Sequence, residues 1–336
     1  MSRVSHWLRL ADRASRRLSG RRYNVAHSLL LSARYARLIE ARLRQQPYDV
    51  IFAAVASTEI ARLRTRIPIV YLSDGTFALL HDYYPWLTNL SVVSVWEGHR
   101  IERAAIAKAR VLLYSTDWAA RSAIQDYGAA AERIHVIPYG ANLTEPPTSE
   151  EVGSRKRGAV IRLLFLGADW ERKGGPIAVD TLRALQKRNV RVELTICGCT
   201  PPDATPIEGV RVIPFLDKRD EAKRRQFRQL LLDADLLLVP TRADCSPIVF
   251  CEASAYGLPV VTTDTGGVSG LVRDGQNGLL LPLSAGGDEY AERIQELLRA
   301  EGRYEALSRA SRAAFEETLN WDAWGRRVAR VLDSVL

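Results

Sequence analysis

Two cations stand side by side in the loop that follows an apolar run in the second half of the chain. The run ends at Gly167, and Arg172 and Lys173 come just before a helical pattern over 174–189. Positive charges beside the N-terminus of a helix, where backbone N–H groups are also unpaired, suit a diphosphate. An exposed basic turn is the alternative interpretation of the same residues.

Two carboxylates lie near the start of another predicted helix, over 247–257. Asp244 follows the strand-like run 235–240, and Glu252 lies further inside the helix. A carboxylate at a phosphate-binding helix end would repel the phosphate, so it needs a different role. Accepting hydrogen bonds from sugar hydroxyls is such a role. We assign Asp244 to a transferred sugar and Glu252 to a ribose. The alternatives are a plain N-cap for Asp244 and a solvated helix residue for Glu252.

A Gly-Gly pair follows the next strand-like run, 258–264. Gly266 and Gly267 allow a tight turn and a close approach of backbone to a ligand. The predicted donor-binding set includes these two glycines and the charged residues above. It also includes Gly167 and, at the start of the preceding helix, Ile248 and Val249. The strand-end loops hold no carboxylate or histidine cluster with metal-ligand spacing, so we expect no metal and no cofactor.

The elements that must position these residues alternate regularly in the second half of the chain. Continuous apolar strands that alternate with helices indicate a parallel sheet covered on both faces, in a doubly wound α/β domain. The predicted strands are 160–167, 191–198, 210–216, 235–240 and 258–264, with a final strand near 279–282. The predicted helices are 174–189, 218–234, 247–257, 286–299, 302–318 and 321–335.

The first half shows the same alternation less completely. Strands are predicted at 49–56, 67–73, 110–115 and 133–138, and helices at 95–109 and 117–128. A Rossmann-like domain normally opens with a strand and a Gly-rich turn, and neither is recognisable before residue 49. Asp74, at a strand end in YLSDGT, is an acceptor-side candidate, with a simple turn aspartate as the alternative.

The boundaries of the predicted domains follow from these patterns, whereas the roles of the two domains are what a family resemblance implies. We expect an N-terminal acceptor-side domain over 1–143, a linker over 144–159 and a C-terminal nucleotide-sugar-binding domain over 160–318. The linker is rich in proline, glycine, serine and charge and has no period. A last helix over 319–336 is expected to pack back towards the N-terminal domain.

Composition limits the class of protein. The 336 residues carry a net charge of +8, and no run approaches the ~18 apolar residues of a membrane helix. The N-terminus lacks the apolar segment of a secretory signal, and Cys197 and Cys251 lie in apolar runs typical of reduced thiols. We therefore expect a cytoplasmic protein, although two disulfides are the alternative.

Arginines are dense before residue 70. They indicate a solvated helix face or, as a sharper alternative, contact with anionic lipid at the inner face of the membrane. Nucleic acid is not expected as a partner, because no aromatic-interleaved or zinc-finger pattern accompanies the charge.

The ordered motifs of the second half resemble the C-terminal domain of glycosyltransferase family 4, the retaining GT-B enzymes. That family has a basic Lys-Gly loop, then an acidic residue and a glutamate separated by seven positions. The counterparts are Lys173-Gly174, Asp244 with Glu252, GLPVV at 257–261, Gly266-Gly267 and NGLL at 277–280. VIPYGANL at 136–143 is similar to the segment before the family's linker. The resemblance covers about residues 133–282.

The resemblance implies two Rossmann-like domains facing a cleft, with the N-terminal one shortened or its opening strand unrecognisable. It also implies retaining transfer of a sugar from a nucleotide-diphospho-sugar to a glycan, lipid-linked or small-molecule acceptor, in bacterial polysaccharide or glycoconjugate synthesis. Arg172 and Lys173 would neutralise the leaving diphosphate, and with Asp244 they form the expected catalytic set. The alternatives are a non-catalytic sugar-nucleotide-binding or scaffold protein and a nucleotide-sugar epimerase.

Three positions depart from the family's pattern. Asp244 replaces the usual glutamate, which shortens the reach of the carboxylate. Ala168 stands where the family often has an arginine, and Arg172 is the expected substitute. Pro247 stands where a glycine is usual, and it removes one N–H that could meet the donor.

Overall fold

The computed structural model describes residues 3–153, 158–202 and 206–336, with side chains from residue 7 onward. The chain divides into two compact units. Unit 1 contains the residues up to 137 together with 326–336, and unit 2 contains 138–325. The predicted linker, 144–159, begins after this change of unit. It includes a short helix, α7 (Ser149–Gly153), and its residues 154–157 lie outside the described part.

Unit 2 contains a six-stranded parallel sheet, as the apolar runs predict. In space the strands follow the order β10-β9-β8-β5-β6-β7, and every pairing is parallel. The bounds are β5 (Ile161–Leu166), β6 (Val192–Cys197), β7 (Val210–Ile213), β8 (Leu236–Val239), β9 (Val260–Thr263) and β10 (Gly278–Leu281).

The order of these strands reverses between β5 and β8. The chain winds outward from β5 through β6 to β7, then returns to the other side of β5 and winds outward through β8, β9 and β10. The loops after β5 and β8 therefore leave the same edge of the sheet in opposite directions. A crevice forms where such loops separate, and open α/β sheets bind ligands there.

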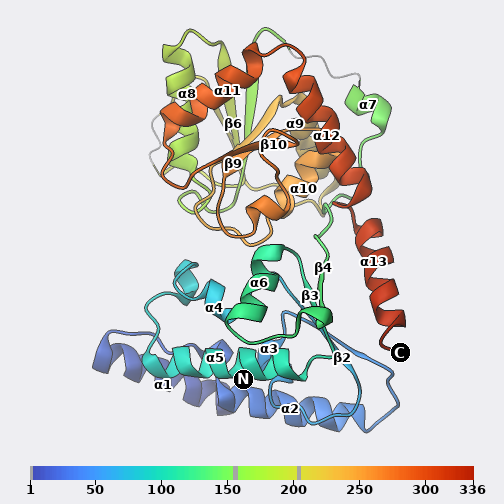
Figure 1. Ribbon diagram of the computed structural model, residues 1–336. Helices are drawn as coiled ribbons and strands as arrows, with labels where there is room; N and C mark the ends of the chain where they lie inside the picture. The colour runs from blue at the N-terminus through green and yellow to red at the C-terminus, as the bar shows by residue number, and fades with distance from the viewer. Residues whose placement is uncertain (1–2, 154–157, 203–205) are drawn as a thin grey trace. The chain divides into compact units, whose positions relative to one another are not determined.

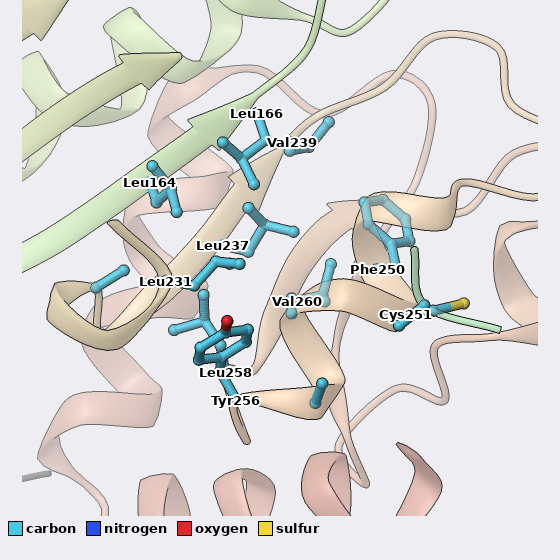
Figure 2. Close-up of a cluster of buried hydrophobic side chains, with 14 of the residues drawn as sticks. Leu164, Leu166, Leu231, Leu237, Val239, Phe250, Cys251, Tyr256, Leu258 and Val260 are labelled. Carbon is cyan, nitrogen blue, oxygen red and sulfur yellow. The ribbon is translucent and has the colours of Figure 1, made fainter. Parts of the chain in front are cut away.

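Alternate side chains of β5 point to opposite faces of the sheet, and each face has its own core. Leu164 and Leu166 pack with α9 (Glu221–Asp233) and α10 (Ile248–Ala255), whereas Leu163 and Phe165 pack with α8 (Gly175–Lys187) and α11 (Gly287–Arg299). Figure 1 shows α8 and α11 on the same side of this sheet. Figure 2 shows the first core, in which Phe250 and Tyr256 of α10 approach the leucines of β5 and β8. Helix α12 (Arg303–Glu317) contributes to both cores.

Unit 1 contains a four-stranded parallel sheet with the simple order β1-β2-β3-β4. The strands are β1 (Ile51–Ala54), β2 (Ile69–Ser73), β3 (Val111–Tyr114) and β4 (Ile134–Val136). The helices are α1 (Arg3–Ser19), α2 (Leu29–Leu43), α3 (Ser57–Ile60), α4 (Phe77–Leu80), α5 (Val92–Lys108) and α6 (Asp117–Gln125). No strand precedes β1 within the described residues, as predicted. The fold class, two parallel-sheet α/β domains, is confirmed.

Two predicted element boundaries are wrong near the ligand-binding edge. The helix predicted over 218–234 begins at Glu221, because the Asp220 side chain accepts a hydrogen bond from the Lys223 N–H and caps it. Strand β7 ends at Ile213 rather than 216. Lys218 therefore lies in the loop between β7 and α9, and not on the helix.

The four cysteines are all thiols, so the alternative of two disulfides is wrong. Burial raises the pKa of the Cys197 thiol to about 11, as expected of reduced cysteines in apolar surroundings. In the part of the chain that the structure describes, no helix combines the length and the apolar character needed to cross a membrane. The last helix is α13 (Trp321–Asp333), and its residues from 326 onward belong to unit 1.

Candidate active site

The loop after β5 is fixed against the end of β8. Gly174 has φ +77°, and a Cβ atom there would lie 2.0 Å from the Pro240 carbonyl oxygen. The Arg242 N–H donates to the Arg172 carbonyl at 2.7 Å. A glycine is thus required at 174, both for its backbone angle and for the close approach. These contacts bring the two loops of the strand-order reversal together.

Lys173 and Asp244 form an ion pair inside this crevice. The Nζ atom lies 2.5 Å from Oδ2 of Asp244, and the residues are only 8% and 7% exposed. The Thr241 hydroxyl lies 3.3 Å from the same carboxylate oxygen. The interpretation of Lys173 as part of an exposed basic turn is therefore wrong. A buried pair of this kind leaves a costly unpaired charge if one partner is removed.

Arg172 lies at the edge of the same ion pair. Its guanidinium donates to the Ala243 carbonyl at 2.9 Å and lies 4.0 Å from the Asp244 carboxylate. The Nε atom is 3.4 Å from Oδ2 of Asp169, within its own loop. The side chain is thus held where a second positive charge can face a ligand at the crevice.

Two of the predicted glycines lie against these charged residues. The Gly267 N–H donates to the Asp244 carbonyl at 3.0 Å, and Gly266 has φ +57°. A Cβ atom at Gly167 would lie 2.8 Å from Cγ of Lys173. We call Gly167, Arg172, Lys173, Asp244 and Gly267 the switch-point cluster, because it occupies the ends of β5, β8 and β9 beside the reversal.

The alternative of an N-cap role for Asp244 is wrong. Helix α10 begins at Ile248, and Pro247 occupies the N-cap position with no side-chain cap. Pro247 is therefore not the first helical residue, contrary to the predicted helix bounds. Ile248 and Val249 form the first, half-buried turn of α10, and Val249 packs against the core.

Glu252 lies in a second charged contact, on α10. It is 2% exposed, so its interpretation as a solvated helix residue is wrong. Its Oε1 atom lies 2.5 Å from Nζ of Lys218, which also donates to the Asn142 carbonyl at 3.2 Å. Burial raises the pKa of Glu252, and the charge of Lys218 opposes that shift.

Sequence reasoning did not identify Lys218 as a site residue. The run LDKRDEAKRR resembles the solvated face of a helix, and we expected the helix to include position 218. The strand that precedes Lys218 could have identified this lysine as a site residue, because loops at the carboxyl ends of parallel strands face the ligand.

Asp74 lies apart from these contacts, in unit 1. It follows β2 and is half-buried, and the Thr76 side chain caps the short helix α4 next to it. Unit 1 also has a surface cavity of about 440 Å³. Its lining includes Arg21, His81, Val92 and Trp96. The role of Asp74 remains a prediction.

A further cavity lies in unit 2, away from the predicted donor site. It measures about 480 Å³, is lined in part by Arg162, Glu193 and Asp233, and lies at the amino ends of the strands, opposite the switch-point cluster. Among the described residues, no group of three or more His, Cys, Asp or Glu side chains is arranged to hold a metal ion.

Comparison with protein families agrees with this geometry. The family described as "Glycosyl transferases group 1" matches residues 161–300, and the family described as "Glycosyltransferase Family 4" matches residues 5–145. The second match shows that unit 1 has a family counterpart although no strand precedes β1 among the described residues.

Individual curated relatives share a low sequence identity with this chain. The D-inositol 3-phosphate glycosyltransferase of Xylanimonas cellulosilytica is 28% identical over 242 residues, which are 66% of this chain and 56% of that protein. The chain thus spans little more than half the length of this curated relative.

Solved structures show the same fold at low identity. Sucrose-phosphate synthase from Thermosynechococcus elongatus is 17% identical with a TM-score of 0.68, and 91% of this chain and 78% of that chain are covered. Anabaena HepE in complex with UDP and glucose is 19% identical with a TM-score of 0.63, and 89% and 81% are covered. With both halves of the chain matched by family and by fold, this protein belongs to the GT-B glycosyltransferases of the family 4 type.

Proposed function

We propose that this protein transfers a sugar, with retention of anomeric configuration, from a nucleotide-diphospho-sugar to an acceptor hydroxyl. The observation that carries the proposal is the switch-point cluster, in which Arg172, Lys173 and Asp244 meet at the reversal of strand order. Cations there suit the diphosphate of the donor, and the carboxylate suits the hydroxyls of the sugar.

In the proposed reaction, the bond between the anomeric carbon and the diphosphate oxygen breaks while the acceptor oxygen attacks from the same face. The departing phosphate oxygen takes the proton of the acceptor hydroxyl, so no protein nucleophile is required. Lys173 and Arg172 stabilise the negative charge that develops on the leaving diphosphate. Asp244 first releases Lys173 to the phosphate and then accepts hydrogen bonds from the transferred sugar.

Glu252 would bind the ribose of the same donor. A buried carboxylate can accept hydrogen bonds from two neighbouring hydroxyls, and ribose offers such a pair. UDP is the nucleotide to test first, because HepE, which shares this fold, was solved in complex with UDP and glucose. We propose that no metal ion takes part, since two protein cations supply the charge neutralisation.

Unit 1 would bind the acceptor, which we propose is glycan- or lipid-linked. Val92 and Trp96 are largely exposed at the start of α5, and Arg100 lies over the Trp96 ring at 5.3 Å. Arg22 donates to the Pro85 carbonyl, beside exposed Trp86. Aromatic and basic side chains together suit the interface of an anionic membrane. We propose peripheral binding there, on the cytoplasmic side, in polysaccharide or glycoconjugate synthesis.

The donor proposal is tested by incubating the purified protein with a panel of nucleotide sugars and measuring slow release of the nucleoside diphosphate. We expect one donor to be hydrolysed and to raise the melting temperature. The anomeric coupling in the NMR spectrum of the released or transferred sugar should match that of the donor. Binding without any turnover would favour the non-catalytic alternative, and interconversion of the sugar would favour an epimerase.

Chelation tests the metal-free mechanism separately. Turnover should be unchanged in excess EDTA. A loss of turnover that manganese or magnesium restores would contradict the proposed role of the two cations.

The membrane proposal predicts co-sedimentation with phosphatidylglycerol vesicles and not with phosphatidylcholine vesicles. Replacing Trp96 and Arg100 together with alanine should weaken that binding and leave donor hydrolysis unchanged. Equal sedimentation with both kinds of vesicle would contradict it.

A further inference from the structure

Lys218 is anchored on three sides at the carboxyl end of the unit 2 sheet. Its Nζ atom lies 2.5 Å from Oε1 of Glu252, 3.2 Å from the Asn142 carbonyl oxygen and 4.9 Å from the centre of the Phe227 ring. A lysine side chain samples many rotamers in solution. Three simultaneous contacts restrict that freedom, so the ammonium group has one defined place beside Glu252.

Burial by itself favours the protonated form of Glu252. The carboxyl group is 2% exposed, and burial raises its pKa. Contact with Lys218 and a hydrogen bond from the Asn142 backbone both oppose that rise. Burial also raises the pKa of the Cys251 thiol on the same helix and of the Tyr256 hydroxyl at its C-cap, so the neutral forms of both groups are favoured beside Glu252.

Nearby cations on α9 make other contacts. Arg224 donates to the Lys218 carbonyl at 3.5 Å, and Arg225 forms an ion pair with Glu221. Arg228, on α9, forms an ion pair with Glu151 and a contact with Tyr256. Among the described residues, Lys218 is the cation in ion-pair contact with Glu252.

The protonation state of Glu252 decides what it can bind. An ionised carboxylate offers about four lone-pair sites, and a protonated one exchanges part of that capacity for a donor. Lys218 occupies one site on Oε1, which leaves enough acceptors for two hydroxyl groups. Without the lysine, burial would favour the protonated carboxyl group, which meets a pair of ribose hydroxyls with one donor and fewer acceptors.

We infer that Lys218 is a positioning residue that holds Glu252 as an oriented carboxylate for the ribose hydroxyls of the nucleotide. The inference rests on the proposed function of unit 2, and it adds a second lysine–carboxylate pair to the one at the switch-point cluster. Lys218 acts through Glu252 and needs no contact with the nucleotide.

The test is the pH dependence of UDP affinity, measured by titration calorimetry on the full chain between pH 6.5 and 9. We expect Lys218→Met to bind roughly tenfold more weakly than the wild type at pH 7. Its affinity should recover as the pH rises, because a higher pH ionises Glu252 without help from the lysine. Lys218→Arg should bind like the wild type, and so should Lys223→Met, which removes an exposed lysine from the same region.

Three outcomes separate the inference from the proposed function. A loss in Lys218→Met that is the same at every pH would mean that Lys218 contacts UDP directly, and it would overturn the positioning role. Wild-type affinity in Lys218→Met together with weak binding in Glu252→Gln would also overturn it, while the donor site would stand. Unchanged affinity in Glu252→Gln would overturn the donor site itself.

A second variant covers the case in which methionine does not fold at this position. Lys218→Gln keeps hydrogen-bond donors but removes the charge. It should show the same pH-dependent loss as Lys218→Met, and wild-type behaviour in Lys218→Gln would contradict the inference.

Discussion

Buried carboxyl groups have different partners in the two units. In unit 1, Glu102 of α5 is 2% exposed and accepts a hydrogen bond from the Tyr71 hydroxyl at 3.1 Å. No cation lies within ion-pair distance of it among the described residues. In unit 2, Asp244 and Glu252 are about as deeply buried, yet each contacts a lysine at 2.5 Å.

We expect this difference to separate a structural carboxyl group in unit 1 from the two that we propose bind the donor in unit 2. Burial raises the pKa of Glu102 to about 7, so this group is largely neutral at slightly acidic pH and serves as a hydrogen-bond partner in the core. A carboxylate that must accept hydrogen bonds from a ligand has to stay charged, and a buried one needs a cation for that. The two lysine-paired carboxylates lie at the carboxyl ends of the strands, where we propose the donor binds, whereas Asp235, also buried and paired with Arg162, lies at the opposite edge.

The largest effect should follow from breaking the ion pair of the switch-point cluster. Lys173→Met removes the ion-pair partner of the buried Asp244 carboxylate at 2.5 Å, while the Arg172 guanidinium lies 4.0 Å away. We expect a loss of roughly 3 kcal/mol in the free energy of unfolding, measured by urea denaturation. UDP affinity of the folded fraction should fall by about 1.5–3 kcal/mol. Unchanged UDP affinity in calorimetry would remove Lys173 from the donor site.

The next largest effect is expected for Glu102, the buried carboxyl group of unit 1. Because the pKa of folded Glu102 is above that of the unfolded chain, the unfolded chain releases the proton first as the pH rises. The wild type should therefore lose roughly 2–3 kcal/mol of stability between pH 5 and pH 8 through this group. Glu102→Gln, which stays neutral, should not show that part of the loss. Parallel stability curves for the two proteins would show that Glu102 is already ionised at pH 5.

The two carboxylates of unit 2 should separate functionally. Glu252→Gln should weaken both free UDP and the intact donor by roughly 1–3 kcal/mol. Asp244→Asn should not weaken the binding of free UDP but should lower the turnover of the intact donor, because we assign Asp244 to the transferred sugar. Free-nucleotide affinity and turnover of both variants are the measurements. Small, equal effects in both assays would contradict the assignment of these carboxylates to the donor.

The smallest effect is expected for Arg172→Ala. The side chain contacts a backbone carbonyl and lies 4.0 Å from Asp244, so the fold has other supports at this point. We expect a loss of about 1 kcal/mol in UDP affinity, with little change in stability. If UDP affinity is unchanged in this variant but reduced in Lys173→Met, Arg172 does not substitute for the arginine absent at Ala168.

The strands and the switch-point cluster could be predicted because their signals are local. Continuous apolar runs such as LLFL identify buried parallel strands, and loops at strand ends are the expected place for Arg172, Lys173 and Asp244. The reversal of strand order could not be read from these runs, since it depends on which strands pair across long separations in the sequence.

The lysine partners were harder to predict than the carboxylates. Whether Lys218 lies on a helix or before it depends on the cap at Asp220, close to the predicted helix start. The same uncertainty of a few residues placed Pro247 inside α10 rather than at its N-cap. A shift of one turn decides whether a lysine reaches Glu252 or faces water, so charged runs at element boundaries cannot be assigned from the sequence alone.

The segments where the chain enters and leaves unit 2 lie side by side. The Ala141 N–H donates to the Leu319 carbonyl at 3.0 Å, and the Trp321 indole donates to the Asn142 side chain at 2.9 Å. A Cβ atom at Gly140 would lie 2.3 Å from the Trp321 nitrogen. Unit 2 therefore has the geometry of an inserted domain, whose two ends meet and whose core is its own. Because the boundary at 325 falls inside α13 (Trp321–Asp333), a segment from 138 to the end of that helix is the one to express alone as the proposed nucleotide-binding module, or to exchange with the corresponding segment of a related enzyme to change the proposed donor.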